Sequence, residues 1–161
     1  MSHERLSTYL NDHLAGAAAG LEMVSTLAAI DGHRGWADAL RAEIEQDRTT
    51  LEALMQRLNI QSSTVRQSTG WLAEKFARLK TRLDDTSGGA LQQLELLEAL
   101  SLGIEGKRSL WTALQTAAAD NDQLRSLDYD TLIERAQTQR RTVEVQRLQA
   151  AADALTMERS I

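Results

Sequence analysis

The sequence predicts an all-α domain in which long amphipathic helices form an up-down bundle and one shorter helix connects its two halves. Three observations support this fold class. Apolar residues recur in steps of three and four along most of the 161 residues, which is the spacing of helices that bury one face. Proline, which breaks helices, is absent. No segment shows the strict alternation of polar and apolar residues that is typical of a half-buried strand.

Length and composition predict one globular domain, 1–161. This length is close to the commonest size of a single hydrophobic core, about 100 to 150 residues. Hydrophobic residues make up 42% of the chain and charged residues 25%, which is ordinary for a folded protein. Cysteine is absent, which excludes disulfides, thiolate metal ligands and a cysteine nucleophile and fits a reducing compartment.

Charge and hydropathy limit the partners. The formal net charge is −5, which argues against a nucleic-acid partner, since binding to phosphates depends on clustered basic residues. No apolar run approaches the roughly 18 residues of a membrane span, and the N-terminal segment lacks the features of a signal peptide. We therefore expect a cytoplasmic protein with neither a nucleic-acid nor a membrane partner.

Turn-forming residues separate the apolar repeats. Asp31-Gly32 interrupts the first repeat, the segment 84–89 is rich in Asp, Ser and Gly, and 120–122 reads Asp-Asn-Asp, all residues that favour turns. The first two helices should pair as an antiparallel hairpin. The predicted helices span residues 2–29, 36–58, 64–83 and 90–119, with a fifth that follows the N-cap Asp128 and runs through Ala154.

Asp47 is the polar residue that the bundle is most expected to bury. It falls near the middle of the apolar stripe of the second helix, and Glu43 lies one turn earlier at the edge of that stripe. A buried carboxylate without a counter-charge, a metal or several hydrogen bonds costs several kcal/mol. Asp47 should therefore have a partner, which is an ion pair or, alternatively, a metal or another ligand.

The fifth helix offers two candidate partners for Asp47. Arg140 and Arg147 are one heptad apart among inward-facing small residues. Arginine suits a buried pair because it stays charged and can bind a carboxylate through two donors. Glu43, Asp47, Arg140 and Arg147 are thus the predicted buried polar cluster. The alternative is that both arginines extend outward to solvent along their aliphatic stems.

Other candidate residues are either metal ligands or ordinary packing and surface residues. His13 lies on the flank of the first-helix stripe, where it is either a metal ligand or a hydrogen-bonded packing residue. Glu98 and Glu105 share one flank of the fourth helix, where they either converge on a cation or form a solvated acidic face. Residues 103–107 contain the glycines and lysine of a phosphate loop, but they lack its spacing and lie within a helical pattern.

The order of the elements carries a family resemblance. Two long helices, a connection and two further long helices with acidic residues facing inward resemble the ferritin-like superfamily over most of the chain. Di-iron members of that superfamily carry Glu on two helices and Glu-x-x-His on the other two. Here 43–46 reads Glu-Ile-Glu-Gln and 144–147 reads Glu-Val-Gln-Arg, so other residues stand in both histidine places.

The resemblance leaves three functions open. The missing histidines favour a non-catalytic bundle without metal or cofactor, in a structural or interaction role. The first alternative is a di-metal oxidoreductase or a metal-storage protein that holds iron or manganese on carboxylates. The second is a module that binds a small acidic ligand through Arg140 and Arg147. Ligands for the metal alternative would come from His13, Glu43, Asp47, Glu98, Glu105 and Glu144.

A second apolar arc on the fourth helix predicts a homodimer. One bundle core ordinarily needs a single stripe from each helix, whereas this helix carries two. Exposed leucines in line would form a patch of the kind that marks an interface, and a two-fold dimer would bury it against its own copy. The arc consists of Leu96, Leu100, Leu110 and Leu114. The alternative is that the short third helix covers this arc within the same chain, so that no partner is needed.

Overall fold

The computed structural model describes residues 2–30, 32–63 and 89–156, and in this part of the chain helices are joined by turns and irregular segments, without a strand. The all-α class is therefore confirmed. The predicted helix 64–83 lies outside the described residues. The elements are α1 (Ser2–Ala28), α2 (Arg34–Arg57), α4 (Gly89–Ala117), the short 3₁₀ helix η1 (Asp122–Leu124) and α5 (Tyr129–Leu155).

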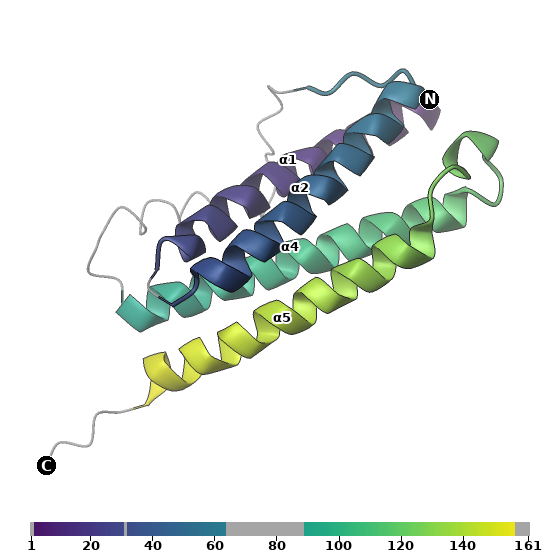
Figure 1. Ribbon diagram of the computed structural model, residues 1–161. Coiled ribbons are helices and arrows are strands. Elements are labelled where there is room, and N and C mark those ends of the chain that lie inside the picture. The colour runs from purple at the N-terminus through teal and green to yellow at the C-terminus, as the bar shows by residue number, and fades with distance from the viewer. Residues whose placement is uncertain (1, 31, 64–88, 157–161) are drawn as a thin grey trace, which may run out of the picture.

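The helices form two antiparallel hairpins, α1–α2 and α4–α5 (Figure 1). The hairpins meet where α1 packs against α4. Both α2 and α4 begin at the same end of the bundle, so these two helices run in the same direction (Figure 1). The strict up-down order thus holds within each hairpin but not between them. Helix α2, with 24 residues, ends about 36 Å from the end of the bundle at which both α2 and α4 begin.

The predicted helix ends follow from local hydrogen bonding. The side chain of Asp128 accepts a hydrogen bond from Thr131 N at 3.1 Å and caps α5, as its position in the sequence indicated. Asn59 has a φ of 54° just beyond α2. The backbone nitrogen of Ile60 then donates to Met55 O at 2.9 Å and the Ile60 side chain is buried, which together close α2 with a Schellman motif.

The hydrophobic core consists of two clusters stacked along the bundle. One lies toward the α1–α2 turn and includes Leu27, Ile44 and Leu97. The other lies toward the α4–α5 turn and includes Leu54 and Trp111, among others. On each of α2, α4 and α5 a polar position falls between residues of the two clusters, so that a polar layer crosses the bundle between them. Its positions are 47 on α2, 107 on α4 and 135 on α5, and Gln139 extends it into the cluster nearer the α1–α2 turn, between Ala136 and Val143.

The second arc of α4 is part of the chain's own core. Leu96, Leu100, Leu110 and Leu114 are all at most 2% exposed. The helix needs two apolar faces because it packs against α1 on one side and against α5 on the other. The arc is therefore not a spare face, and the structure does not support the predicted homodimer through the fourth helix. No described helix is both long and apolar enough to cross a membrane.

Two leucines of α4 test this arrangement. Leu100 is 1% exposed, whereas Leu102, two positions along the same helix, is 43% exposed. We expect Leu100→Ala to lower the free energy of unfolding by about 2 to 5 kcal/mol, because it leaves a cavity in the core. Leu102→Ala should cost less than about 1 kcal/mol. Urea denaturation of both variants checks this, and equal losses would contradict the placement of the arc.

Candidate functional site: a buried charge network

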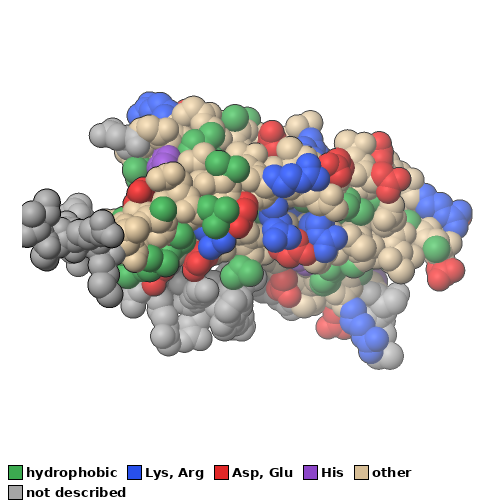
Figure 2. Space-filling model, turned by 90° about the horizontal axis from the view of Figure 1, so that it is seen from below, with side chains coloured by type: hydrophobic (Ala, Val, Ile, Leu, Met, Phe, Trp, Pro, Cys, Tyr) green, Lys and Arg blue, Asp and Glu red, His purple; other side chains and the backbone are tan. Residues whose placement is uncertain are grey.

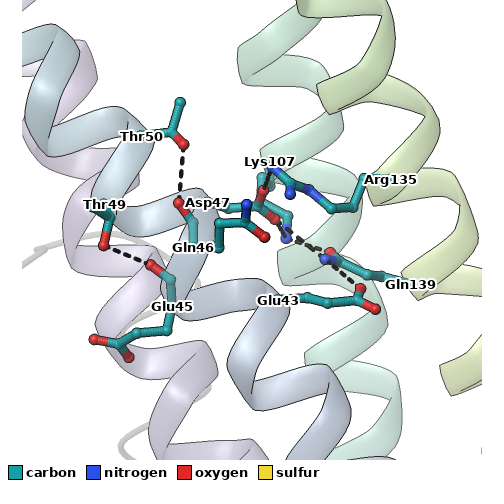
Figure 3. A network of polar contacts seen from close by, with 9 residues as sticks. All are labelled: Glu43, Glu45, Gln46, Asp47, Thr49, Thr50, Lys107, Arg135 and Gln139. Atoms are coloured by element: carbon teal, nitrogen blue, oxygen red, sulfur yellow. Dashed lines mark hydrogen bonds and ion pairs between the residues drawn. The ribbon is translucent and has the colours of Figure 1, made fainter.

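Asp47 is the centre of the polar layer. The residue is 2% exposed, and each of its carboxylate oxygens contacts a different cationic side chain (Figure 3). Lys107 Nζ of α4 donates to Oδ2 at 2.5 Å, and Arg135 Nη2 of α5 lies 2.6 Å from Oδ1. The Arg135 contact is an ion pair without hydrogen-bond alignment. One carboxylate of the first hairpin thus holds both helices of the second.

Gln139 extends the network on α5. Its side chain is fully buried, and its amide nitrogen donates to Asp47 Oδ2 at 3.2 Å and to Glu43 Oε2 at 3.0 Å. Its amide oxygen accepts a hydrogen bond from Lys107 Nζ. The carbonyl side therefore faces the ammonium and the amino side faces the two carboxylates, so every polar atom of this buried amide faces a group of the matching kind.

The network balances its own charge. Glu43 and Asp47 are acidic, and Lys107 and Arg135 are basic. Burial lowers the pKa of Lys107, while the adjacent Asp47 carboxylate acts against this shift and Arg135 adds to it. Charges placed in a poorly solvated interior are tolerated when they are paired and hydrogen-bonded. Each charge of the layer therefore lies beside an opposite charge or the Gln139 amide, while Arg135 Nε is buried without a hydrogen-bond partner.

The structure corrects the predicted partners of Asp47. It brings Glu43 and Asp47 together, but Arg140 and Arg147 lie outside the network. Arg140 is 49% exposed at its side chain and its Nη1 lies 2.8 Å from Glu105 Oε2. Arg147 pairs with Glu144 at 2.7 Å on its own helix and lies 3.6 Å from Glu98.

The rotation of α5 explains this error. The side chains that α5 buries include Ala136, Gln139 and Val143, and Arg140 is about 100° around the helix from Gln139. Gln139 thus takes the inward position that the prediction gave to the arginines. Both arginines instead lie at the edge of α5 that faces the acidic residues of α4.

Sequence reasoning missed Lys107, Arg135 and Gln139. Lys107 stands three residues after Ile104 and four before Trp111, both of which are buried. It therefore fills a gap in an apolar line, as Asp47 does between Ile44 and Leu51. This gap was the available signal, because a polar residue in the middle of an apolar stripe needs a partner of opposite charge on a facing helix.

Of the residues proposed as metal ligands, the structure brings together only Glu43 and Asp47 among the described residues. The ring of His13 packs edge-to-face on Tyr9 with centroids 4.7 Å apart, and burial lowers the pKa of His13, against a smaller opposing effect of Asp12. Glu98, Glu105 and Glu144 each pair with an arginine. Within the described ranges, no three His, Asp or Glu residues are grouped as a metal site would require.

Comparison with known proteins finds no matching family model, no similar curated protein and no similar solved structure.

Removal of the Asp47 carboxylate should destabilise the fold. We expect Asp47→Ala to lower the free energy of unfolding by about 3 to 5 kcal/mol, because Lys107 and Arg135, which are 14% and 21% exposed at their side chains, lose their buried counter-charge. Glu45→Ala is the matched control, since Glu45 is an exposed carboxylate on the same helix, and it should change stability by less than about 0.5 kcal/mol. A loss below about 1 kcal/mol for Asp47→Ala in chemical denaturation would contradict the network.

The lowered pKa of Lys107 predicts how its contribution depends on pH. In the unfolded state Lys107 loses its ammonium proton near the usual lysine pKa of about 10.4. In the native state it loses this proton at a lower pH. Between the two pKa values the unfolded state binds more protons, so the contribution of Lys107 to stability rises with pH. The stability of the wild type relative to Lys107→Met should therefore increase as pH rises through this window. A constant difference up to pH ~10.4 would contradict this assignment.

Proposed function

We propose that this protein is a metal-free, non-catalytic helical bundle of ferritin-like layout with a structural or interaction role. The proposal rests on the two ion pairs of Asp47, whose carboxylate oxygens contact Lys107 and Arg135. The acidic group best placed to bind a cation in the core already has two cationic partners from its own chain.

The layout supports the ferritin-like part of the proposal. Two antiparallel hairpins joined by a long connection, with α2 parallel to α4 (Figure 1), match the single long crossover of ferritin-like bundles. Metal sites of such bundles are built in the core from side chains on facing helices. In this chain the polar layer drawn from α2, α4 and α5 occupies the core between the two hydrophobic clusters.

The chemistry of the layer supports the absence of a resident metal. Iron and manganese sites in ferritin-like bundles use carboxylates together with imidazoles. The amide of Gln139 already donates a hydrogen bond to Glu43. A divalent ion near Asp47 would also meet the positive charges of Lys107 and Arg135 at short range, and in a low-dielectric interior this repulsion is severe.

The network supports a structural role because it fixes how the hairpins meet. Apolar packing alone is non-directional, whereas Asp47 satisfies its partners in only one alignment of α2 with α4 and α5. Separating the partners of a buried ion pair is strongly destabilising, even though the intact pair stabilises a fold little more than well-packed apolar residues would. Alignments that separate Asp47 from its partners are therefore disfavoured. The lack of cysteine further fits our assignment of the protein to a reducing compartment such as the cytoplasm.

Metal analysis tests the proposal. We expect purified protein to contain no stoichiometric metal, and Fe²⁺ or Mn²⁺ should leave its melting temperature unchanged. A specific ligand at 100 times its dissociation constant would stabilise the native state by about 2.7 kcal/mol, which a thermal scan detects.

The matched control is Glu43→Gln with Asp47→Asn, which removes the two core carboxylates. A metal-dependent rise in melting temperature that disappears in this variant would overturn the proposal, as would two ions per chain in the purified wild type.

A further inference from the structure

The outer face of the α4–α5 hairpin carries a groove of about 540 Å³. This volume lies within the range of small-molecule sites, about 300 to 1,000 Å³. Figure 2 shows basic side chains gathered beside acidic ones near the middle of the face seen from below. The groove is lined by Arg108, Gln137, Arg140, Arg141 and Glu144.

The charge of this groove is opposite to that of the whole chain. Three arginines and one glutamate line it, whereas the formal net charge of the protein is −5. The carboxylate of Glu144 is moreover bound through two hydrogen bonds to Arg147, which is not among the lining residues. Among the lining residues alone, positive charge therefore exceeds negative charge, three to one, before their partners Glu105 and Glu134 are counted.

A single carboxylate positions two of the three arginines. Arg108 donates to Glu105 through Nε at 3.0 Å and Nη2 at 2.6 Å, and Arg140 donates through Nη1 at 2.8 Å. The two arginines together lower the pKa of Glu105, chiefly through the hydrogen bond from Arg108, so it stays ionised. Glu105 holds both guanidinium groups in place, and the negative charge of Glu144 also acts on Arg140.

The remaining donors are suited to an oxyanion. A guanidinium has five N–H donors, and Arg140 uses only Nη1 within the described residues. Arg141 pairs with Glu134 at 3.1 Å, but both side chains are more than 60% exposed, and such surface pairs are weak. The remaining donors of Arg140 and the exposed guanidinium group of Arg141 can therefore face a ligand, and the amide of Gln137 adds another donor.

We infer that this groove binds a small molecule through a phosphate or carboxylate group held by Arg108, Arg140 and Arg141. Arginine forks match both groups, because each presents paired oxygens to two parallel N–H donors. Preorganisation by Glu105 reduces the entropy that the arginines lose on binding. This inference deepens the proposed interaction role. It is independent of the metal experiment, since no lining residue belongs to the buried network.

Titration with two probes tests the inference and separates the two anion classes. Inorganic phosphate and citrate are added to isotope-labelled protein, and the side-chain Nε–Hε resonances of the arginines are followed by NMR. We expect saturable shifts at Arg108, Arg140 and Arg141 with at least one probe. The responding probe identifies the class of anion that the groove prefers.

Arg140→Gln and Arg41→Gln form the matched pair of variants. Each removes one positive charge, but Arg41 is an exposed residue of α2 that does not line the groove. Arg140→Gln should weaken binding by about tenfold or more, the effect of losing a charged hydrogen bond, and Arg41→Gln should leave it unchanged.

Three results would overturn the inference: no saturable shift with either probe at millimolar concentration, equal weakening in both variants, or shifts that map away from the three arginines. If Arg140→Gln fails to fold by circular dichroism, the mapping of shifts in the wild type decides alone.

Discussion

The buried contact between Asp47 and the two cations Lys107 and Arg135 is the constraint on which the arrangement of the two hairpins depends. Each hairpin brings apolar faces that would pack in many alignments. The carboxylate of Asp47 lies on one hairpin and its partners lie on the other, so only an alignment that pairs them avoids buried unpaired charges. Gln139 strengthens the constraint, since its amide is satisfied only when Glu43, Asp47 and Lys107 surround it.

The same contact determines what the core offers chemically. Two acidic and two basic side chains neutralise one another between the hydrophobic clusters, so a charged ligand gains little from entering this layer. The outer face of α4 and α5 differs, because Glu105 there serves two arginines at once. The core pairs are buried, whereas the arginines of the outer face pair with partly or well exposed carboxylates, so the proposed anion site lies on the outside of the bundle.

Most of the fold follows from features within single helices. The apolar period, the Asp128 cap and the turn residues indicated the described helices to within a few residues of their observed ends, and the position of Asp47 in its stripe indicated burial. Lys107, Arg135 and Gln139 were missed because partners depend on how helices rotate against one another. The leucine arc of α4 was misread for the same reason, since only the packing of α1 and α5 on both sides shows that it is internal.

A double-mutant cycle between Asp47→Ala and Lys107→Met measures the central interaction most directly. If the buried pair fixes the bundle, the free energy of unfolding should show a coupling of about 2 kcal/mol or more, at the upper end of the range for residues in contact. The surface pair Arg48–Glu52, which is 3.0 Å apart on α2, is the control and should give about 0.3 to 0.5 kcal/mol. A coupling at Asp47 and Lys107 no larger than this control would contradict the account.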